Sequence, residues 1–164
     1  MVNNCTIKSN GVGIYWSKSG EYNAAQNCMI TQNNVGMRIT GGNNVGSNLQ
    51  IFENTKGLVL ANDTNSGHGF FTACTFNHNS TSSFEIDDQA EGYSFSSCGL
   101  YYGTGNHIYN SKGIRYYNCD FQFSDIELKT SSNLLMVGCR KPAASVTITL
   151  TSGSDFTYVN NQDY

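Results

Sequence analysis

Two glutamates and a histidine recur at one position of a repeating pattern, where they could perform acid–base chemistry on a sugar. Glu85, His107 and Glu127 lie 22 and 20 residues apart. If successive turns of chain stack at the strand spacing of about 4.8 Å, the backbones of the two glutamates lie about 9.6 Å apart. The carboxyl groups of an inverting glycosidase are separated by roughly 6.5–9.5 Å. We therefore predict Glu85, Glu127 and the neighbouring Asp87 as catalytic residues, with His107 biasing their pKa values.

Aromatic and basic residues give a second chemical signal. Exposed Tyr rings stack on sugar faces while their hydroxyls bond to sugar hydroxyls. We expect carbohydrate contacts from Tyr15, Arg38, His107, Tyr109 and Tyr117. Filling of the core is the alternative for each ring, and Trp16 and Tyr116 fall at inward positions of the pattern.

The acidic row could also serve in two ways that involve no cleavage of a sugar chain. A soluble protein needs some charge on its outer face, so the row could be a solvated surface without further role. It could also bind carbohydrate and leave it intact. The spacing of the residues does not choose between catalysis, binding and solvation.

The repeat that would position these residues is visible in the cysteines. They are Cys5, Cys28, Cys74, Cys98, Cys119 and Cys139, with gaps of 23, 46, 24, 21 and 20 residues. The gap of 46 is twice 23, and Leu49 occupies the missing position, since Asn48-Leu49-Gln50-Ile51 matches Asn27-Cys28-Met29-Ile30. A fixed period of 20–50 residues is typical of solenoids and other repeat folds.

Each repeat contains three short apolar alternations. One follows the cysteine, one is typified by Met37-Arg38-Ile39, and one precedes the next cysteine, as in Tyr93-Ser94-Phe95. Period-2 alternation puts one residue inward and the next outward. We predict an all-β right-handed parallel β-helix, a solenoid of about seven coils with three short strands per coil.

The turns are expected to depend on Asn and Gly. Asn10, Asn33, Asn54 and Asn79 follow the first strand of four repeats, and Asn tolerates the left-handed conformation and can form an amide ladder. Gly11, Gly36, Gly57 and Gly113 are predicted to have positive φ.

The six cysteines are predicted to be a column of free buried thiols. Equivalent residues on stacked coils keep their Cβ atoms near 4.8 Å, beyond the usual 3.5–4.5 Å of a disulfide. The chain lacks closely spaced Cys or His pairs, and His68, His78 and His107 are scattered, so we expect no metal site and no cofactor.

Composition excludes some partners. Charged residues make up 13% of the chain, the net charge is −3, and there is no run of Lys or Arg. Nucleic-acid binding is therefore not expected. No segment approaches the roughly 18 apolar residues of a membrane span, so we expect no membrane insertion.

The recurring Cys-x-Ile/Phe-x-x-Asn unit, seen in Cys5 to Trp16 and in Cys28 to Ile39, resembles the coils of pectate-lyase-like parallel β-helices. It is most similar to those of bacteriophage tailspike and appendage proteins. The resemblance implies a homotrimer, a groove for a bacterial surface glycan, a place in the virion tail and synthesis in the bacterial cytoplasm. Free thiols fit that compartment.

We expect residues 1–141 to form the coils and residues 142–164 to form the last coil with a C-terminal cap, or the start of a trimerisation element. The chain is interpreted as a piece of a longer repeat array. Three functions stay open: a glycan-recognising tailspike segment that could also hydrolyse its glycan, a non-catalytic structural or trimerisation module, and a polysaccharide lyase.

Overall fold

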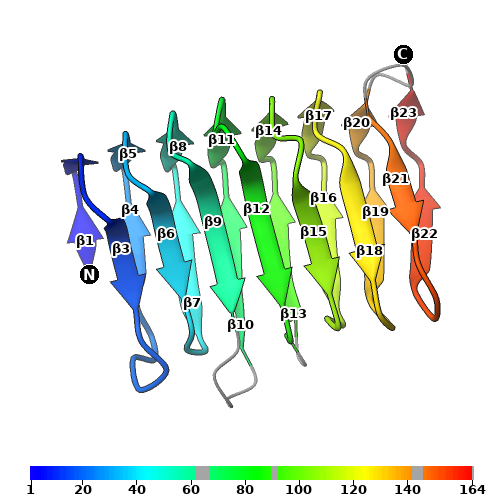
Figure 1. Cartoon of the computed structure of the whole chain (residues 1–164), viewed down its shortest axis with the longest axis horizontal. Coiled ribbons are helices and arrows are strands. Elements are labelled where there is room, and N and C mark those ends of the chain that lie inside the picture. The colour runs from blue at the N-terminus through cyan, green and yellow to red at the C-terminus, as the bar shows by residue number, and fades with distance from the viewer. Residues whose placement is uncertain (62–66, 90–91, 142–145, 164) are drawn as a thin grey trace.

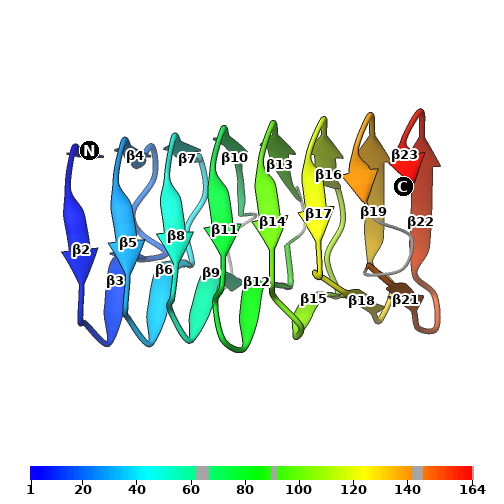
Figure 2. The same cartoon turned by 90° about the horizontal axis from the view of Figure 1, so that it is seen from above.

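The computed structural model describes residues 1–61, 67–89, 92–141 and 146–163, which form a right-handed parallel β-helix of about seven coils. Three parallel sheets run the length of the rod, and each coil adds one strand to each sheet (Figures 1 and 2). The predicted fold is confirmed. The described residues contain no helix long and apolar enough to cross a membrane.

We call the three sheets A, B and C. Sheet A consists of β1 (Val2–Asn3), β4 (Ala24–Gln26), β7 (Asn44–Ser47), β10 (His68–Thr72), β13 (Gly92–Ser96), β16 (Ile114–Tyr117), β19 (Asn133–Val137) and β22 (Asp155–Val159). Sheet B consists of β2 (Thr6–Lys8), β5 (Met29–Thr31), β8 (Gln50–Phe52), β11 (Thr75–Asn77), β14 (Gly99–Tyr101), β17 (Asp120–Gln122), β20 (Arg140–Lys141) and β23 (Gln162–Asp163).

Sheet C consists of β3 (Val12–Trp16), β6 (Val35–Ile39), β9 (Lys56–Ala61), β12 (Ser82–Asp87), β15 (Asn106–Tyr109), β18 (Ile126–Lys129) and β21 (Ile148–Leu150). The strands β21, β22 and β23 add one member to each sheet beyond residue 145. The predicted boundary at residue 142 lies outside the described residues.

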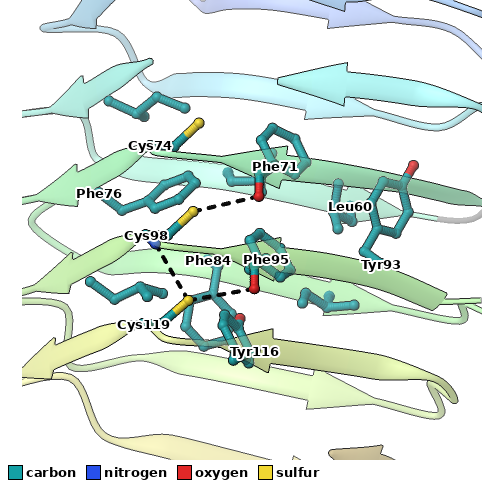
Figure 3. Packing of buried hydrophobic residues seen from close by; sticks show 14 of the residues in the cluster. Leu60, Phe71, Cys74, Phe76, Phe84, Tyr93, Phe95, Cys98, Tyr116 and Cys119 are labelled. Carbon is teal, nitrogen blue, oxygen red and sulfur yellow. Dashed lines mark hydrogen bonds between the residues drawn. The ribbon is translucent and has the colours of Figure 1, made fainter. Parts of the chain in front are cut away.

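The core is a set of columns of like residues. Ile7, Ile30, Ile51, Phe76, Leu100 and Phe121 pair strand to strand in sheet B. In sheet A the rings of Phe71, Phe95 and Tyr116 stack with centroids 5.4 and 4.6 Å apart (Figure 3). Trp16 and Tyr116 are buried as predicted. A single coil cannot bury these side chains, so stability comes from stacking one coil on the next.

Five of the six cysteines lie in this core, and all six are free. Cys5, in the coil at the end of the stack, is exposed, so the prediction of burial is wrong for this residue. The buried thiols donate to backbone carbonyls: the Cys98 Sγ lies 3.6 Å from the Phe71 oxygen (Figure 3). The pKa of Cys119 is raised, first by hydrogen bonds to the neighbouring thiols and then by burial.

An amide ladder runs inside the corner between sheets B and C. The Asn54 Oδ1 accepts from the Asn33 backbone N at 3.0 Å and from its Nδ2 at 2.9 Å, and the Asn79 Oδ1 accepts the same pair from Asn54 at 3.1 Å each. These three asparagines are buried. The ladder is confirmed, but the predicted left-handed backbone belongs to the residue before each asparagine. Those residues are Ser9, Gln32, Glu53 and His78.

Of the four glycines predicted at positive φ, only Gly113 is in that region, with φ 69°. Gly36 and Gly57 are instead needed because the next coil packs so closely against them that a side chain would not fit. A Cβ on Gly57 would lie 2.4 Å from the Ser83 carbonyl oxygen and 2.8 Å from the Asn79 Nδ2. The missing side chain therefore makes space for the amide ladder.

We expect Gly57→Ala to lower the free energy of unfolding by about 1–3 kcal/mol, because the added methyl group overlaps the adjacent backbone. Gly11→Ala is the control, since a Cβ at Gly11 meets nothing within 4 Å. Urea denaturation followed by circular dichroism measures both. Equal stability of the two variants would contradict this role for Gly57.

We expect one thiol of six to react in the folded protein and six to react after denaturation, because only Cys5 is exposed. Titration with dithiobisnitrobenzoate, with and without guanidinium, counts them. Cys5→Ser should reduce the count in the folded state to zero. Rapid reaction of several thiols in the folded protein would show that the core is open.

Candidate functional site

The outer face of sheet C carries the row predicted from the sequence. Tyr15, Arg38, Val59, Glu85, His107, Glu127 and Thr149 are register partners on successive strands from β3 to β21. A second row follows two residues further along the strands and contains Ala61, Asp87, Tyr109 and Lys129. We call these two rows the sheet C face. They bring all three predicted catalytic acids and His107 together.

Glu85 lies at the centre of the sheet C face and is 8% exposed. Its Oε2 lies 2.9 Å from the Lys56 Nζ, and its Oε1 accepts a hydrogen bond of 2.9 Å from the Ser82 Oγ. Both carboxylate oxygens are thus occupied by groups of the protein.

His107 is paired with Asp87. The His107 Nε2 lies 3.0 Å from the Asp87 Oδ1. The pKa of His107 is raised, first by this hydrogen bond, and further by the charges of Asp87 and Glu85, while burial opposes the shift. On its other side His107 has Glu127 as its register partner. His107 is therefore held by Asp87 on one neighbouring coil and aligned with Glu127 on the other.

Glu127 is the more accessible of the two predicted catalytic glutamates. Its Oε2 lies 2.8 Å from the Lys129 Nζ, and the exposed fraction of its side chain is 44%. It lines an open cleft of about 450 Å³ together with Asp125, Lys129 and Thr149. Asp125 also accepts a hydrogen bond of 2.7 Å from the Thr147 backbone N. Six of the eight residues that line this cleft have polar side chains.

Of the predicted carbohydrate contacts, Tyr15, Arg38, His107 and Tyr109 lie on the sheet C face. Tyr15 is 55% exposed and Tyr109 is 40% exposed. Tyr15 lies three coils from Glu85, whereas Tyr109 is the register partner of Asp87. Tyr117 lies on β16 in sheet A, and the structure does not bring it to the sheet C face.

Sequence reasoning missed the lysines. Lys129 could have been found, because it lies two residues after Glu127 on the same strand and hence on the same face. Lys56 could not be found by alternation. It lies two residues before the inward Leu58 on β9, so alternation predicts that its side chain also points inward. It lies at the start of β9, where the turn ends, and reaches Glu85 across one coil.

A ladder of stacked rings at the corner between sheets B and C was also missed. The rings of His78 and Tyr102 lie with centroids 4.4 Å apart, and those of Tyr102 and Phe123 lie 5.0 Å apart. All three residues are exposed and have φ between 48° and 55°. The rings cover one another's faces, so the ladder stabilises the corner and leaves mainly ring edges to solvent.

No group of three or more His, Cys, Asp or Glu within the described ranges is arranged to hold a metal ion. The sheet C face presents paired charges and exposed aromatic rings.

The fold is similar to that of two solved phage tailspike structures. The full-length tailspike protein 2 of an Escherichia coli O157:H7 bacteriophage superposes with a TM-score of 0.77 at 13% identity, over 95% of this chain and 25% of the tailspike. The enzymatically active domain of tailspike protein 2 of bacteriophage CBA120 gives the same TM-score and identity, over 95% of this chain and 27% of that one. The chain thus spans about a quarter of either structure.

The sequence itself matches no protein-family model and no curated protein. At 13% identity the likeness to the tailspikes concerns the fold.

We expect Asp87→Asn to lower the pKa of His107, because the variant removes the carboxylate that contributes most to the raised value. In the wild type the pKa is raised on folding, so the stabilisation is complete below the unfolded value of about 6.5 and is lost as pH rises through the folded value. The variant should lose this pH-dependent part of its stability.

Proton NMR titration of the imidazole signals measures the pKa directly, and the chain has only three histidines to assign. Asp88→Asn is the control, because the Asp88 carboxylate bonds to Asn110 and not to His107. If the pKa of His107 is the same in Asp87→Asn as in the wild type, the His107–Asp87 pair does not form in solution.

Proposed function

We propose that this chain is a segment of a bacteriophage tailspike that recognises a bacterial surface polysaccharide through its sheet C face. The observation that carries the proposal is that charged residues lie in register along one side of the rod, with Tyr15 and Tyr109 exposed on the same face. Rings and hydrogen-bonding groups in a line match the repeating hydroxyls and apolar faces of a polysaccharide. The fold shared with the two tailspikes supports this assignment.

Recognition is better supported than hydrolysis. A general acid must carry a proton that the glycosidic oxygen can reach. Glu85 is nearly inaccessible and is neutralised by Lys56. If the face also hydrolyses its glycan, Glu127 is the carboxylate best placed to act, with Glu85 and Asp87 as the remaining catalytic candidates.

A second candidate is a non-catalytic structural module of a homotrimeric tailspike in the virion tail. It is favoured by the outer face of sheet A. There the row from Ala24 through Val45, Phe70, Ser94, Arg115 and Leu135 to Thr157 carries a single formal charge. Such a face can pack against another copy with little loss of hydration. If this candidate is right, sedimentation velocity will show a trimer and a glycan array will show no binding.

A polysaccharide lyase is the weakest candidate. Such a lyase needs a basic residue beside carboxylates that bind a cation. The register partners of Arg38 are Tyr15 and Val59, and neither of them has a carboxylate.

We expect the purified chain to bind one or more polysaccharides in an array of bacterial capsules and O-antigens, and Tyr109→Ala to weaken that binding about tenfold. Tyr22→Ala is the matched control, because Tyr22 is 80% exposed but belongs to none of the strands. If the chain also releases reducing ends from the bound polysaccharide, and Glu127→Gln abolishes this release, the chain hydrolyses its glycan as well as binding it. Absence of binding across the array would remove the proposal and leave the structural module.

A further inference from the structure

An open hollow lies on the corner between sheets B and C, outside the sheet C face. It has a volume of about 410 Å³, which falls within the range of small-ligand pockets. Its lining comes from three successive corners, those that follow β5, β8 and β11. The ladder residues Asn33 and Asn54 are buried and contribute the floor, whereas Gln32, Asn34 and Glu53 are exposed beside them. We call this feature the corner hollow.

The backbone around the corner hollow is fixed by hydrogen bonds between coils. The Gln32 N donates to the Glu53 oxygen at 3.2 Å, and the Glu53 N donates to the Asn77 oxygen at 3.2 Å. The Asn34 N donates to the Asn10 oxygen at 3.1 Å. Together with the amide ladder, these bonds form the hollow before any ligand is present. A preformed site loses little conformational entropy on binding.

The ring of His78 closes one end of the corner hollow. Tyr102 of the next coil stacks on this ring, with centroids 4.4 Å apart and planes inclined by 27°. All other residues of the lining belong to the corner of His78 or to the two corners before it. The hollow therefore lies on the side of the ring that faces away from Tyr102.

The His78 ring is also held at its edge. The His78 Nδ1 lies 2.6 Å from the Asn77 Oδ1. Within the part of the chain that the structure describes, Tyr102 and Asn77 are the only partners of this ring. The ring is thus oriented by its neighbours and has one face that no other ring covers.

The polar side chains around the corner hollow are not engaged by the rest of the protein. Those of Gln32, Asn34 and Glu53 form no hydrogen bond or ion pair with any described residue. Glu85 on the sheet C face differs, because both of its carboxylate oxygens are occupied. A carboxylate accepts hydrogen bonds and an amide both donates and accepts them, so the corner hollow offers groups that match sugar hydroxyls.

We propose that the corner hollow is a binding subsite for a sugar residue that carries no carboxylate, with the sugar stacked on the face of His78 opposite Tyr102. A pyranose has an apolar face that packs on an aromatic ring, and its hydroxyls bind to Glu53 and the two amides. The described residues that line the hollow include one carboxylate and no Lys or Arg, which disfavours a uronic acid. The identification of the ligand as a sugar rests on the proposed function, whereas the position of the hollow does not.

Methyl glycosides test the subsite independently of any polysaccharide. The neutral probes are the methyl glycosides of glucose, galactose, mannose and N-acetylglucosamine, and methyl glucuronide is the charged counterpart. We expect at least one neutral glycoside to bind with a Kd on the order of 1–10 mM and the glucuronide to bind about fivefold more weakly. In NMR titrations the imidazole signals of His78 and the side-chain amide signals of Gln32 and Asn34 should shift. If no neutral glycoside shifts them, or if the glucuronide binds as tightly, the proposal is wrong.

Variants at His78 test the stacking face. We expect His78→Ala to weaken glycoside binding about fivefold, and His78→Phe, which keeps a ring, to change it by less than about twofold. Phe123→Ala is the matched control, because it removes the ring at the other end of the same ladder, outside the lining of the hollow. It should leave binding unchanged. An equal loss in His78→Ala and Phe123→Ala would show that damage to the ladder, not the ring face, weakens binding, and would overturn the proposal.

Glu53→Gln tests the preference for an uncharged sugar. This variant keeps hydrogen-bonding groups and removes the negative charge, so methyl glucuronide should then bind as tightly as methyl glucoside. If the variant still discriminates as the wild type does, Glu53 does not face the ligand and the subsite is overturned. If a variant does not fold, the shifts of the wild-type signals decide.

His78 and His107 report on the two proposals separately in one sample. Glycoside shifts at His78, in a chain that binds no polysaccharide of the array, support the subsite and remove recognition by the sheet C face. Polysaccharide shifts at His107, with no shift at His78 from any neutral glycoside, overturn the subsite and leave the sheet C face.

Discussion

The structure depends on the register between one coil and the next. Backbone hydrogen bonds of about 2.8–3.3 Å join residues nineteen to twenty-six positions apart, as from Met29 N to the Cys5 oxygen and from Arg140 N to the Cys119 oxygen. Because these bonds align equivalent residues of successive coils, side chains of one kind stack in columns throughout the core. Any change of one position would turn inward columns outward. The same register aligns the charged residues of sheet C.

Much of the architecture could be predicted from the sequence because register is a matter of spacing. The cysteine period located the coils, and the outward row from Tyr15 to Glu127 follows from it by alternation alone. The local chemistry of the row could not be predicted in the same way. Whether Glu85 is free or held by Lys56 depends on a side chain that crosses between coils at a turn, where alternation no longer applies. The left-handed corner residues were missed for a related reason, since Gln32 and Glu53 are not the residue types usually found there.

The outer faces of sheets B and C differ in electrostatics. On sheet C the carboxylates of Glu85, Asp87 and Glu127 each have a basic partner, which is Lys56, His107 and Lys129 respectively. On sheet B, Asp120 pairs with Arg140 and accepts a hydrogen bond from the Tyr101 hydroxyl.

Stacking of equivalent coils also determines how such a rod can change in length. Each coil forms the same pattern of backbone hydrogen bonds with the coil before it and with the coil after it. A whole coil can therefore be inserted or deleted, and the coils that then become neighbours still have complementary hydrogen-bonding groups. A single inserted residue has to be absorbed at a corner instead. The chain contains an example: Asn79 lies 25 residues after Asn54, whereas Ser82 pairs with Lys56, 26 residues before it. Corners are therefore the places where related rods can diverge in sequence length while their sheets stay aligned.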